Sequence, residues 1–173
     1  MVRIPMSRHR RLRKPMQSSA GFTLLEMVTV LLIGGILAAI SAPYFLSRAV
    51  AARQAEGKML ISTLNRAQQM FYTQNQKFSP TVESLALGIS SRNYALNASH
   101  AADPAAYGLS FATSKQVTVR SYAGMAAIVY DAAGNPGMAA IACEADTPNT
   151  LPAATPTYTG TTAQCAPGTH PMK

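Results

Sequence analysis

The most prominent pattern in the chain is a long apolar run close to its N-terminus. From Phe22 to Leu46 only Glu26 is charged, and Met27–Leu46 is 20 consecutive residues without a formal charge. A helix rises ~1.5 Å per residue, so about 20 apolar residues suffice to cross the ~30 Å hydrocarbon core of a membrane. The pattern therefore predicts a membrane-spanning helix in this part of the chain.

The helical pattern continues beyond the apolar run but becomes amphipathic. Apolar residues recur four, three and four positions apart, as on one face of a helix: Leu60, Leu64, Ala67 and Phe71. Polar residues are expected on the opposite face: Lys58, Asn65 and Gln69. The spacing predicts one helix from Phe22 to Tyr72, 51 residues long and roughly 76 Å in length. A helix that long exceeds what a compact domain needs, so its first half is expected to contact lipid or neighbouring subunits.

From Gly108 onward the pattern changes to that of strands. Strands are expected at four segments, 109–113, 116–122, 125–131 and 138–143, with a turn at 133–137. They predict an antiparallel sheet of three or four strands, covered on one face by the apolar stripe of the helix. The preceding segment, 77–107, is expected to be a connection, with a short helix that starts at Ser79-Pro80 and ends at Leu87.

The net charge of +8 is concentrated in the N-terminal segment. Six of the 15 Lys and Arg residues lie in the first 14 positions, and no acidic residue precedes Glu26. From Gly21 onward nine cations stand against seven acids, which leaves +2. A basic flank before an apolar span is retained in the cytoplasm, so the C-terminal part is expected on the other side of the membrane. A charge of +2 on that part does not support direct nucleic-acid binding.

The same N-terminus is compatible with two less specific readings. One is an ordinary secretory signal, with Ala39 and Ser41 three residues and one residue before the cut and Ala42 as the new N-terminus. The other is an uncleaved signal anchor. A secretory signal is disfavoured by Glu26 at the start of the apolar region and by Pro43 directly after the cut.

The segment Gly21-Phe22-Thr23-Leu24-Leu25-Glu26 resembles the type IV pilin and pseudopilin family, whose leader is a class III signal peptide. A basic leader ends in Gly, Phe follows, and Glu occupies the fifth position of an apolar helix. Pro43 is the twenty-second residue after this junction, where pilins also commonly carry proline. The resemblance implies an α+β fold, in which a long N-terminal helix packs on a small antiparallel β-sheet with a C-terminal disulfide loop.

The resemblance also implies roles for individual residues. A prepilin peptidase would cut between Gly21 and Phe22, and Phe22 would then be N-methylated. Glu26 would serve subunit assembly, because a carboxylate in an apolar segment is costly and the new amine of Phe22 in a neighbouring subunit can neutralise it. Neither Gly21 nor Phe22 is catalytic, since the peptidase supplies the chemistry.

Three residues inside the apolar run weaken a helix: Gly34, Gly35 and Pro43. We expect the helix to kink or melt locally there. With the junction after Gly21, these features divide the chain into four parts. The parts are a cleaved cytoplasmic leader (1–21), a transmembrane half-helix (22–46), an amphipathic half-helix (47–75) and an exported β-rich domain (76–173).

Cys143 and Cys165 are the only cysteines in the chain. In a domain exported to an oxidising space such a pair predicts a disulfide, whereas two free thiols would fit a cytosolic protein. The resemblance to pilins implies that the loop 143–165, and Thr147–Gln164 within it, forms part of an exposed fibre surface.

The sequence contains no nucleophile–base motif, phosphate-binding loop or dinucleotide fingerprint. We therefore predict a non-enzymatic protein and assign no catalytic residue, metal ligand or cofactor. One alternative is a calcium site, for which Asp131, Glu144 and Asp146 could approach one another across a hairpin.

The resemblance implies that the chain is a prepilin, a major or minor subunit of a type IV pilus that supports adhesion, twitching motility or DNA uptake. The expected partners are prepilin peptidase, other pilin subunits, the inner-membrane assembly platform and, before assembly, membrane lipid. The expected location is the inner membrane before assembly and an extracellular pilus or periplasmic pseudopilus afterwards. The alternatives are a pseudopilin of a type II secretion system and a monomeric envelope binding protein, anchored or secreted.

Overall fold

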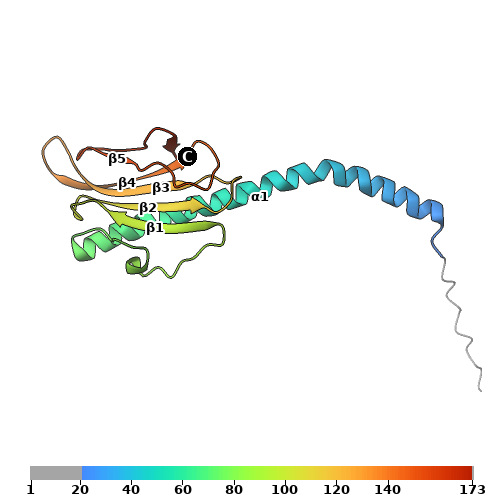
Figure 1. The fold of residues 1–173 in the computed structure, drawn as a ribbon, viewed down its shortest axis with the longest axis horizontal. Helices are drawn as coiled ribbons and strands as arrows, with labels where there is room; N and C mark the ends of the chain where they lie inside the picture. The colour runs from blue at the N-terminus through green and yellow to red at the C-terminus, as the bar shows by residue number, and fades with distance from the viewer. Residues whose placement is uncertain (1–20, 173) are drawn as a thin grey trace, which may run out of the picture. The chain divides into compact units, whose positions relative to one another are not determined.

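The computed structural model describes residues 21–172, except for the side chain of Pro43. The predicted leader therefore lies outside the described residues, apart from Gly21. The chain divides into two units, and the boundary along the sequence lies between Ala42 and Pro43. A single long helix, α1 (Leu24–Asn75), is followed by a 3₁₀ turn, η1 (Glu83–Leu85), and by seven strands (Figure 1).

Helix α1 has 52 residues, which confirms the predicted long helix with shifts of two to three residues at its ends. Thr23 precedes the helix and caps it, because its Oγ1 accepts a hydrogen bond from the amide of Glu26 at 3.2 Å. After Asn75 the chain leaves the helix at Gln76, which has a left-handed φ of 55°. The backbone stays helical at Gly34, Gly35 and Pro43, and the kinking role of these residues remains a prediction.

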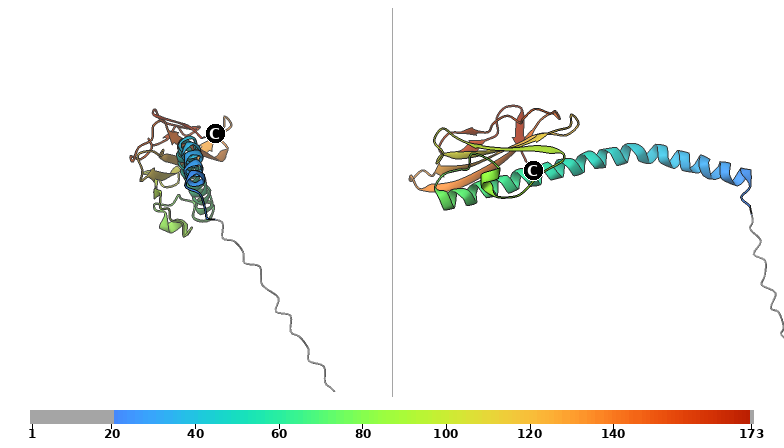
Figure 2. Two further views of the ribbon diagram at one scale, coloured as in Figure 1. Left: turned by 90° about the vertical axis from the view of Figure 1, so that its right-hand side faces the viewer. Right: turned by 60° about the horizontal axis from the view of Figure 1, so that its bottom comes forward.

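The main sheet has five antiparallel strands in the order β1-β2-β3-β4-β7. Their bounds are β1 (Tyr94–His100), β2 (Tyr107–Ser114), β3 (Tyr122–Tyr130), β4 (Pro136–Ala145) and β7 (Thr169–Pro171). Two short strands, β5 (Thr157–Tyr158) and β6 (Ala163–Gln164), form a separate hairpin. The second half of α1 lies along one face of the sheet, and the C-terminal segments lie over the other (Figure 2). This arrangement confirms the predicted α+β fold.

Three predictions of secondary structure were wrong. Residues 116–121 form a loop instead of a strand, because the Ser114 hydroxyl bonds both the amide and the carbonyl of Gln116 and turns the chain. Residues 94–100, predicted as a connection, are strand β1 and pair with β2 along seven residues. The predicted helix up to Leu87 shrinks to η1, since Ala86 adopts a left-handed φ of 53° directly after it.

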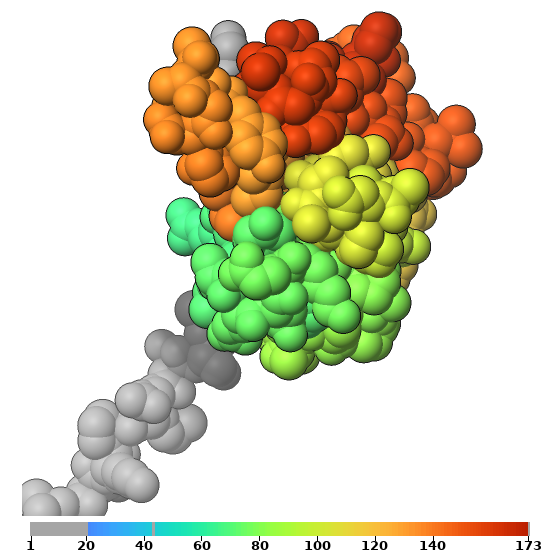
Figure 3. Space-filling view, turned by 90° about the vertical axis from the view of Figure 1, so that its left-hand side faces the viewer, coloured from blue at the N-terminus to red at the C-terminus, as the bar shows by residue number. Residues whose placement is uncertain are grey.

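The core lies between α1 and the sheet. Leu64 and Ala67 of the predicted apolar stripe are buried in it, and Ile61 joins them with no exposed surface. The sheet contributes the large buried rings of Tyr94 and Tyr122, whose centroids lie 6.0 Å apart. Figure 3 views this unit from the end at which α1 finishes. The end of the helix, the loop that leads into β2 and the β3–β4 hairpin lie next to one another there.

Small residues on the sheet allow α1 to approach it closely. Gly124 on β3 lies against Asn65, which was predicted to face solvent but is only 5% exposed. The Asn65 amide instead donates a hydrogen bond to the carbonyl of Ile141 on β4 at 2.9 Å. Gly108 on β2 lies against the buried Gln68 in the same way. The prediction for Asn65 was wrong because the missing side chain at Gly124 leaves room for a polar group that bonds the sheet backbone.

Candidate functional site

The N-terminal part of α1 presents apolar side chains on all sides. Every described side chain from Phe22 to Leu46 is exposed, with exposed fractions of 83% for Leu24 and 77% for Phe45. Helix α1 is the one described helix long and apolar enough to cross a membrane, with a mean hydropathy of 2.3 over its most apolar window. A helix that is apolar all round requires lipid or other protein around it.

The residues of the predicted processing site lie directly before this helix. Gly21, Phe22 and Thr23 are outside α1 and exposed, and an added Cβ at Gly21 would meet nothing within 4 Å. Glu26 lies in the first turn of α1, four residues after Phe22. Within residues 21–172, Glu26 forms no ion pair. Its carboxylate is therefore free to pair with a group from another molecule, and its role in assembly remains a prediction.

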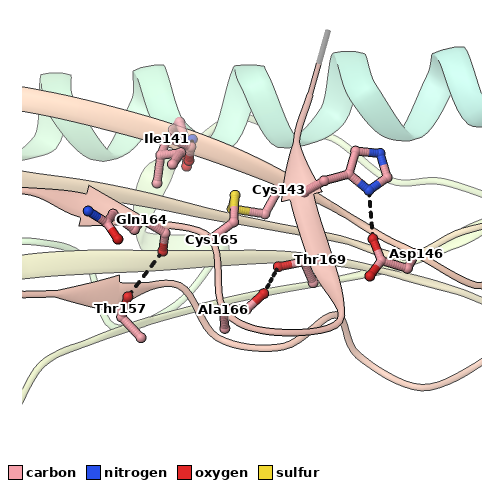
Figure 4. Close-up of a disulfide and its surroundings, with 10 residues drawn as sticks. Ile141, Cys143, Asp146, Thr157, Gln164, Cys165, Ala166 and Thr169 are labelled. Carbon is pink, nitrogen blue, oxygen red and sulfur yellow. Dashed lines mark hydrogen bonds and ion pairs between the residues drawn. A yellow bond between two sulfur atoms is a disulfide. The ribbon is translucent and has the colours of Figure 1, made fainter.

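The predicted disulfide between Cys143 and Cys165 is confirmed, with Cα atoms 5.7 Å apart (Figure 4). It joins β4 to the residue that follows β6 and so closes the loop that contains the β5–β6 hairpin. Most of the loop is exposed, but Ala153 is only 5% exposed and packs on the sheet near Ala123. Tyr158 fastens the hairpin by donating its hydroxyl hydrogen to the carbonyl of Ile128. The loop is thus a fixed layer over the second face of the sheet.

A buried ion cluster joins α1 to the face of the sheet opposite the disulfide loop. Glu144 of β4 is 4% exposed, accepts a hydrogen bond from Arg120 at 2.9 Å and forms an ion pair with Lys58 of α1 at 3.1 Å. Burial alone would raise the pKa of Glu144, but Arg120 and Lys58 outweigh it and hold the pKa below its ordinary value. Sequence patterns did not indicate this cluster, because its three members lie far apart along the chain.

The three acids considered for a calcium site do not converge. Asp131 accepts hydrogen bonds from the Asn135 side chain and backbone in the β3–β4 turn, whereas Glu144 lies in the ion cluster. Asp146 pairs with His170 at 2.7 Å. Among residues 21–172 no group of three or more His, Cys, Asp or Glu side chains is placed to hold a metal ion.

The buried Glu144 predicts a stability that falls in acid. Its carboxyl has a lower pKa in the folded state than in the unfolded chain, where the pKa of a Glu side chain is ~4.3. Its stabilisation is therefore complete above the unfolded pKa and is lost as the pH falls through the folded pKa. We expect Glu144→Gln to lower the free energy of unfolding by roughly 2 kcal/mol at about pH 7, and to weaken the loss of stability in acid.

Urea unfolding of the full chain in mild detergent, at about pH 7 and about pH 3, measures both effects. Glu83→Gln is the matched control, because Glu83 is exposed and forms no ion pair among the described residues. A Glu144→Gln variant that loses as much stability in acid as the unmodified chain would contradict the assignment. Glu56 also has a lowered pKa, owing to hydrogen bonds from Ser91 and Asn93, so part of the pH dependence is expected to remain.

Comparison with known proteins adds to this geometry. A family model described as the prokaryotic N-terminal methylation motif matches residues 16–42. A second model, type IV pilin-like G and H, matches residues 54–166, well over half of the chain. The chain belongs to the type IV pilin-like G and H family. The pilin-like match spans both cysteines, and the motif match spans the junction at Gly21 and Phe22.

A curated relative agrees with this membership over a short stretch. The type IV major pilin protein PilA of Myxococcus xanthus (strain DK1622) is 39% identical over 59 residues, which are 34% of this chain. The match spans 27% of the length of that pilin, about a quarter. No solved structure matches the chain.

Proposed function

We propose that this pilin-like chain is a prepilin that is cleaved after Gly21 and polymerised into a type IV pilus fibre. The observation that carries the proposal is the uncharged helix segment Met27–Leu46, whose described side chains are all exposed, joined to a folded unit of the pilin-like family. The same helix segment is surrounded by two different environments in succession. Lipid surrounds it before assembly, and the apolar helices of neighbouring subunits replace the lipid in the fibre.

Glu26 and Phe22 account for the staggered arrangement of subunits in this proposal. Cleavage creates an α-ammonium group on Phe22, four residues before Glu26 in the chain. In an apolar fibre core an unpaired carboxylate is costly, so pairing with the ammonium group of a neighbouring subunit stabilises the staggered arrangement. Methylation of the amine leaves its positive charge in place and does not prevent the pairing.

The proposal implies a defined set of partners and locations. A prepilin peptidase acts on the Gly21–Phe22 bond on the cytoplasmic side, and an assembly platform in the inner membrane extracts the subunit. Other pilin subunits then surround it in the extracellular fibre. The exported unit tiles the outside of the fibre, and the disulfide loop 143–165, most of which is exposed, contributes to that surface.

The N-terminus of the native protein tests the proposal. Intact-mass and N-terminal analysis of protein from its own host should find Phe22 first, with the mass of one added methyl group. Gly21→Val should leave the leader attached, because the branched side chain obstructs the cleavage site, whereas the matched leader variant Ser18→Val should be processed normally. An N-terminus at Ala42, or an uncut Met1, would contradict the prepilin assignment. Recovery in the sheared surface fraction, as opposed to retention in the envelope, distinguishes a pilus from a secretion pseudopilus.

A further inference from the structure

Charged residues are sorted to opposite ends of the unit that begins at Pro43. The basal end is formed by residues 48–58 of α1, by the loop 88–93 and by the loop 115–121. It carries six cations: Arg48, Arg53, Lys58, Arg92, Lys115 and Arg120. The opposite end, formed by the segments 76–83, 101–106 and 131–135, carries one cation and three acids: Lys77, Glu83, Asp103 and Asp131.

Three acids lie in or beside the basal end, which leaves its six cations an excess of three positive charges. Glu144 is buried between Lys58 and Arg120, Glu56 accepts hydrogen bonds from the 88–93 loop, and Asp146 pairs with His170. Three exposed cations of the basal end form no ion pair among the described residues: Arg48, Arg92 and Lys115. The basal end therefore presents positive charge to an external partner.

Hydrogen bonds hold the two basal loops against α1. Arg53 donates to the side chain of Gln116 at 2.7 Å, and Lys115 donates to the carbonyl of Ser91 at 3.1 Å. The Gln116 amide also donates to the side chain of Asn93 at 3.1 Å. The cations of three separate segments are consequently fixed on one surface. Val117, at the tip of the 115–121 loop, is an apolar residue among these cations, and 71% of it is exposed.

Processing changes which end of the apolar helix carries cationic side chains, and this step rests on the proposed function. The leader holds six cations, and cleavage after Gly21 removes all of them. The first cationic side chains left in the chain are Arg48 and Arg53, directly after the apolar run, and the new ammonium group of Phe22 stands beside the carboxylate of Glu26 at the other end. Cationic side chains at the end of a spanning helix extend to the lipid headgroups and set the depth of the helix. After cleavage that anchor lies on the exported side alone.

We propose that the basal end docks on anionic phospholipid headgroups of the exported leaflet and holds the processed subunit at a fixed depth until assembly. Basic side chains with an interspersed exposed apolar residue are the composition that binds an anionic membrane surface. The basal cations of α1 follow the apolar run directly along the chain, which favours lipid over nucleic acid or over the acidic end of a second subunit. Docking keeps the domain of the unassembled subunit against the membrane, and extraction of the subunit into the fibre breaks these contacts.

A single tryptophan can report this docking, because the chain contains none. The full chain with Val117→Trp is reconstituted into vesicles of phosphatidylcholine, alone or mixed equally with phosphatidylglycerol, and quenching by brominated lipid is measured. We expect strong quenching and blue-shifted emission only in the vesicles that contain phosphatidylglycerol. Each cation near an anionic surface strengthens binding roughly fivefold, so Arg92→Gln with Lys115→Gln should weaken the phosphatidylglycerol preference by at least about fivefold.

Matched variants separate this docking from mere insertion of the apolar helix. Ala133→Trp places the reporter in the exposed β3–β4 turn and should remain unquenched in both kinds of vesicle. Removal of two cations away from the basal end, Arg66→Gln with Lys77→Gln, should leave the signal of the Val117→Trp reporter unchanged. Equal quenching in both vesicles, or loss of the phosphatidylglycerol response to competing duplex DNA, would overturn the proposal. A chain that fails to float with either vesicle would overturn the membrane step of the proposed function as well.

Discussion

Replacement of Gly57 by valine is expected to lower the free energy of unfolding of the unit that begins at Pro43 by about 3 kcal/mol. An added Cβ at Gly57 would lie 2.5 Å from a ring carbon of Tyr122 and 2.6 Å from the ring of Tyr94. Both rings are buried, with 0% and 1% exposed, so neither can move aside without disturbing the core. The variant must push α1 away from the sheet or displace both tyrosines.

Thermal unfolding of the full chain in mild detergent, followed by circular dichroism, measures this loss. Gly137→Val is the matched control, since an added Cβ there meets Val129 only at the ordinary contact distances of 3.8 and 3.9 Å. We expect the control to change stability by less than ~0.5 kcal/mol. Equal effects of the two substitutions would show that the close contact between α1 and the sheet does not hold in solution.

Removal of the carboxylate of Glu26 is expected to reduce incorporation of the subunit into sheared fibres by at least about tenfold. Tenfold corresponds to ~1.4 kcal/mol, which is less than the ~2–5 kcal/mol lost when one partner of a buried charge pair is truncated. Membrane insertion should stay intact, because Glu26→Ala makes the segment more apolar. Quantitative immunoblotting of the sheared and membrane fractions measures both quantities.

Two further variants identify the cause of such a loss. Glu26→Gln keeps the shape of the side chain without the charge and should be as defective as Glu26→Ala. Thr29→Ala is the matched control, because the Thr29 hydroxyl only donates to the carbonyl of Glu26 within the same helix, and it should be incorporated normally. Normal incorporation of Glu26→Gln would remove the ion pair with Phe22 from the mechanism.

The long helix was predictable because its pattern is strong and local. The apolar run and the four-three-four spacing after it need no tertiary information, and α1 begins and ends within three residues of the prediction. The disulfide was predictable for a different reason. With only Cys143 and Cys165 in the chain, one intramolecular pairing exists, and the predicted export to an oxidising space favours its formation.

The errors in the sheet have a common physical origin. Strand β1 has the sequence Tyr-Ala-Leu-Asn-Ala-Ser-His, in which no residue is β-branched, so its pairing with β2 outweighs a weak local preference. Residues 116–121 show the opposite case. Their alternating Val117 and Val119 suggest a strand, but hydrogen bonds between the Ser114 side chain and the backbone of Gln116 turn the chain instead.

The sequence by itself determined the features that depend on neighbouring residues: the apolar span with Glu26, the Gly21–Phe22 junction, the extent of α1 and the cysteine pair. Only the tertiary structure decided the burial of Asn65 and the cluster around Glu144. It also decided the gathering of cations at the basal end, where Arg53, Arg92 and Lys115 come from three separate segments. The physical reason is that burial and charge pairing depend on contacts between distant residues. The glycines at 57, 108 and 124 permit those contacts by letting α1 approach the sheet.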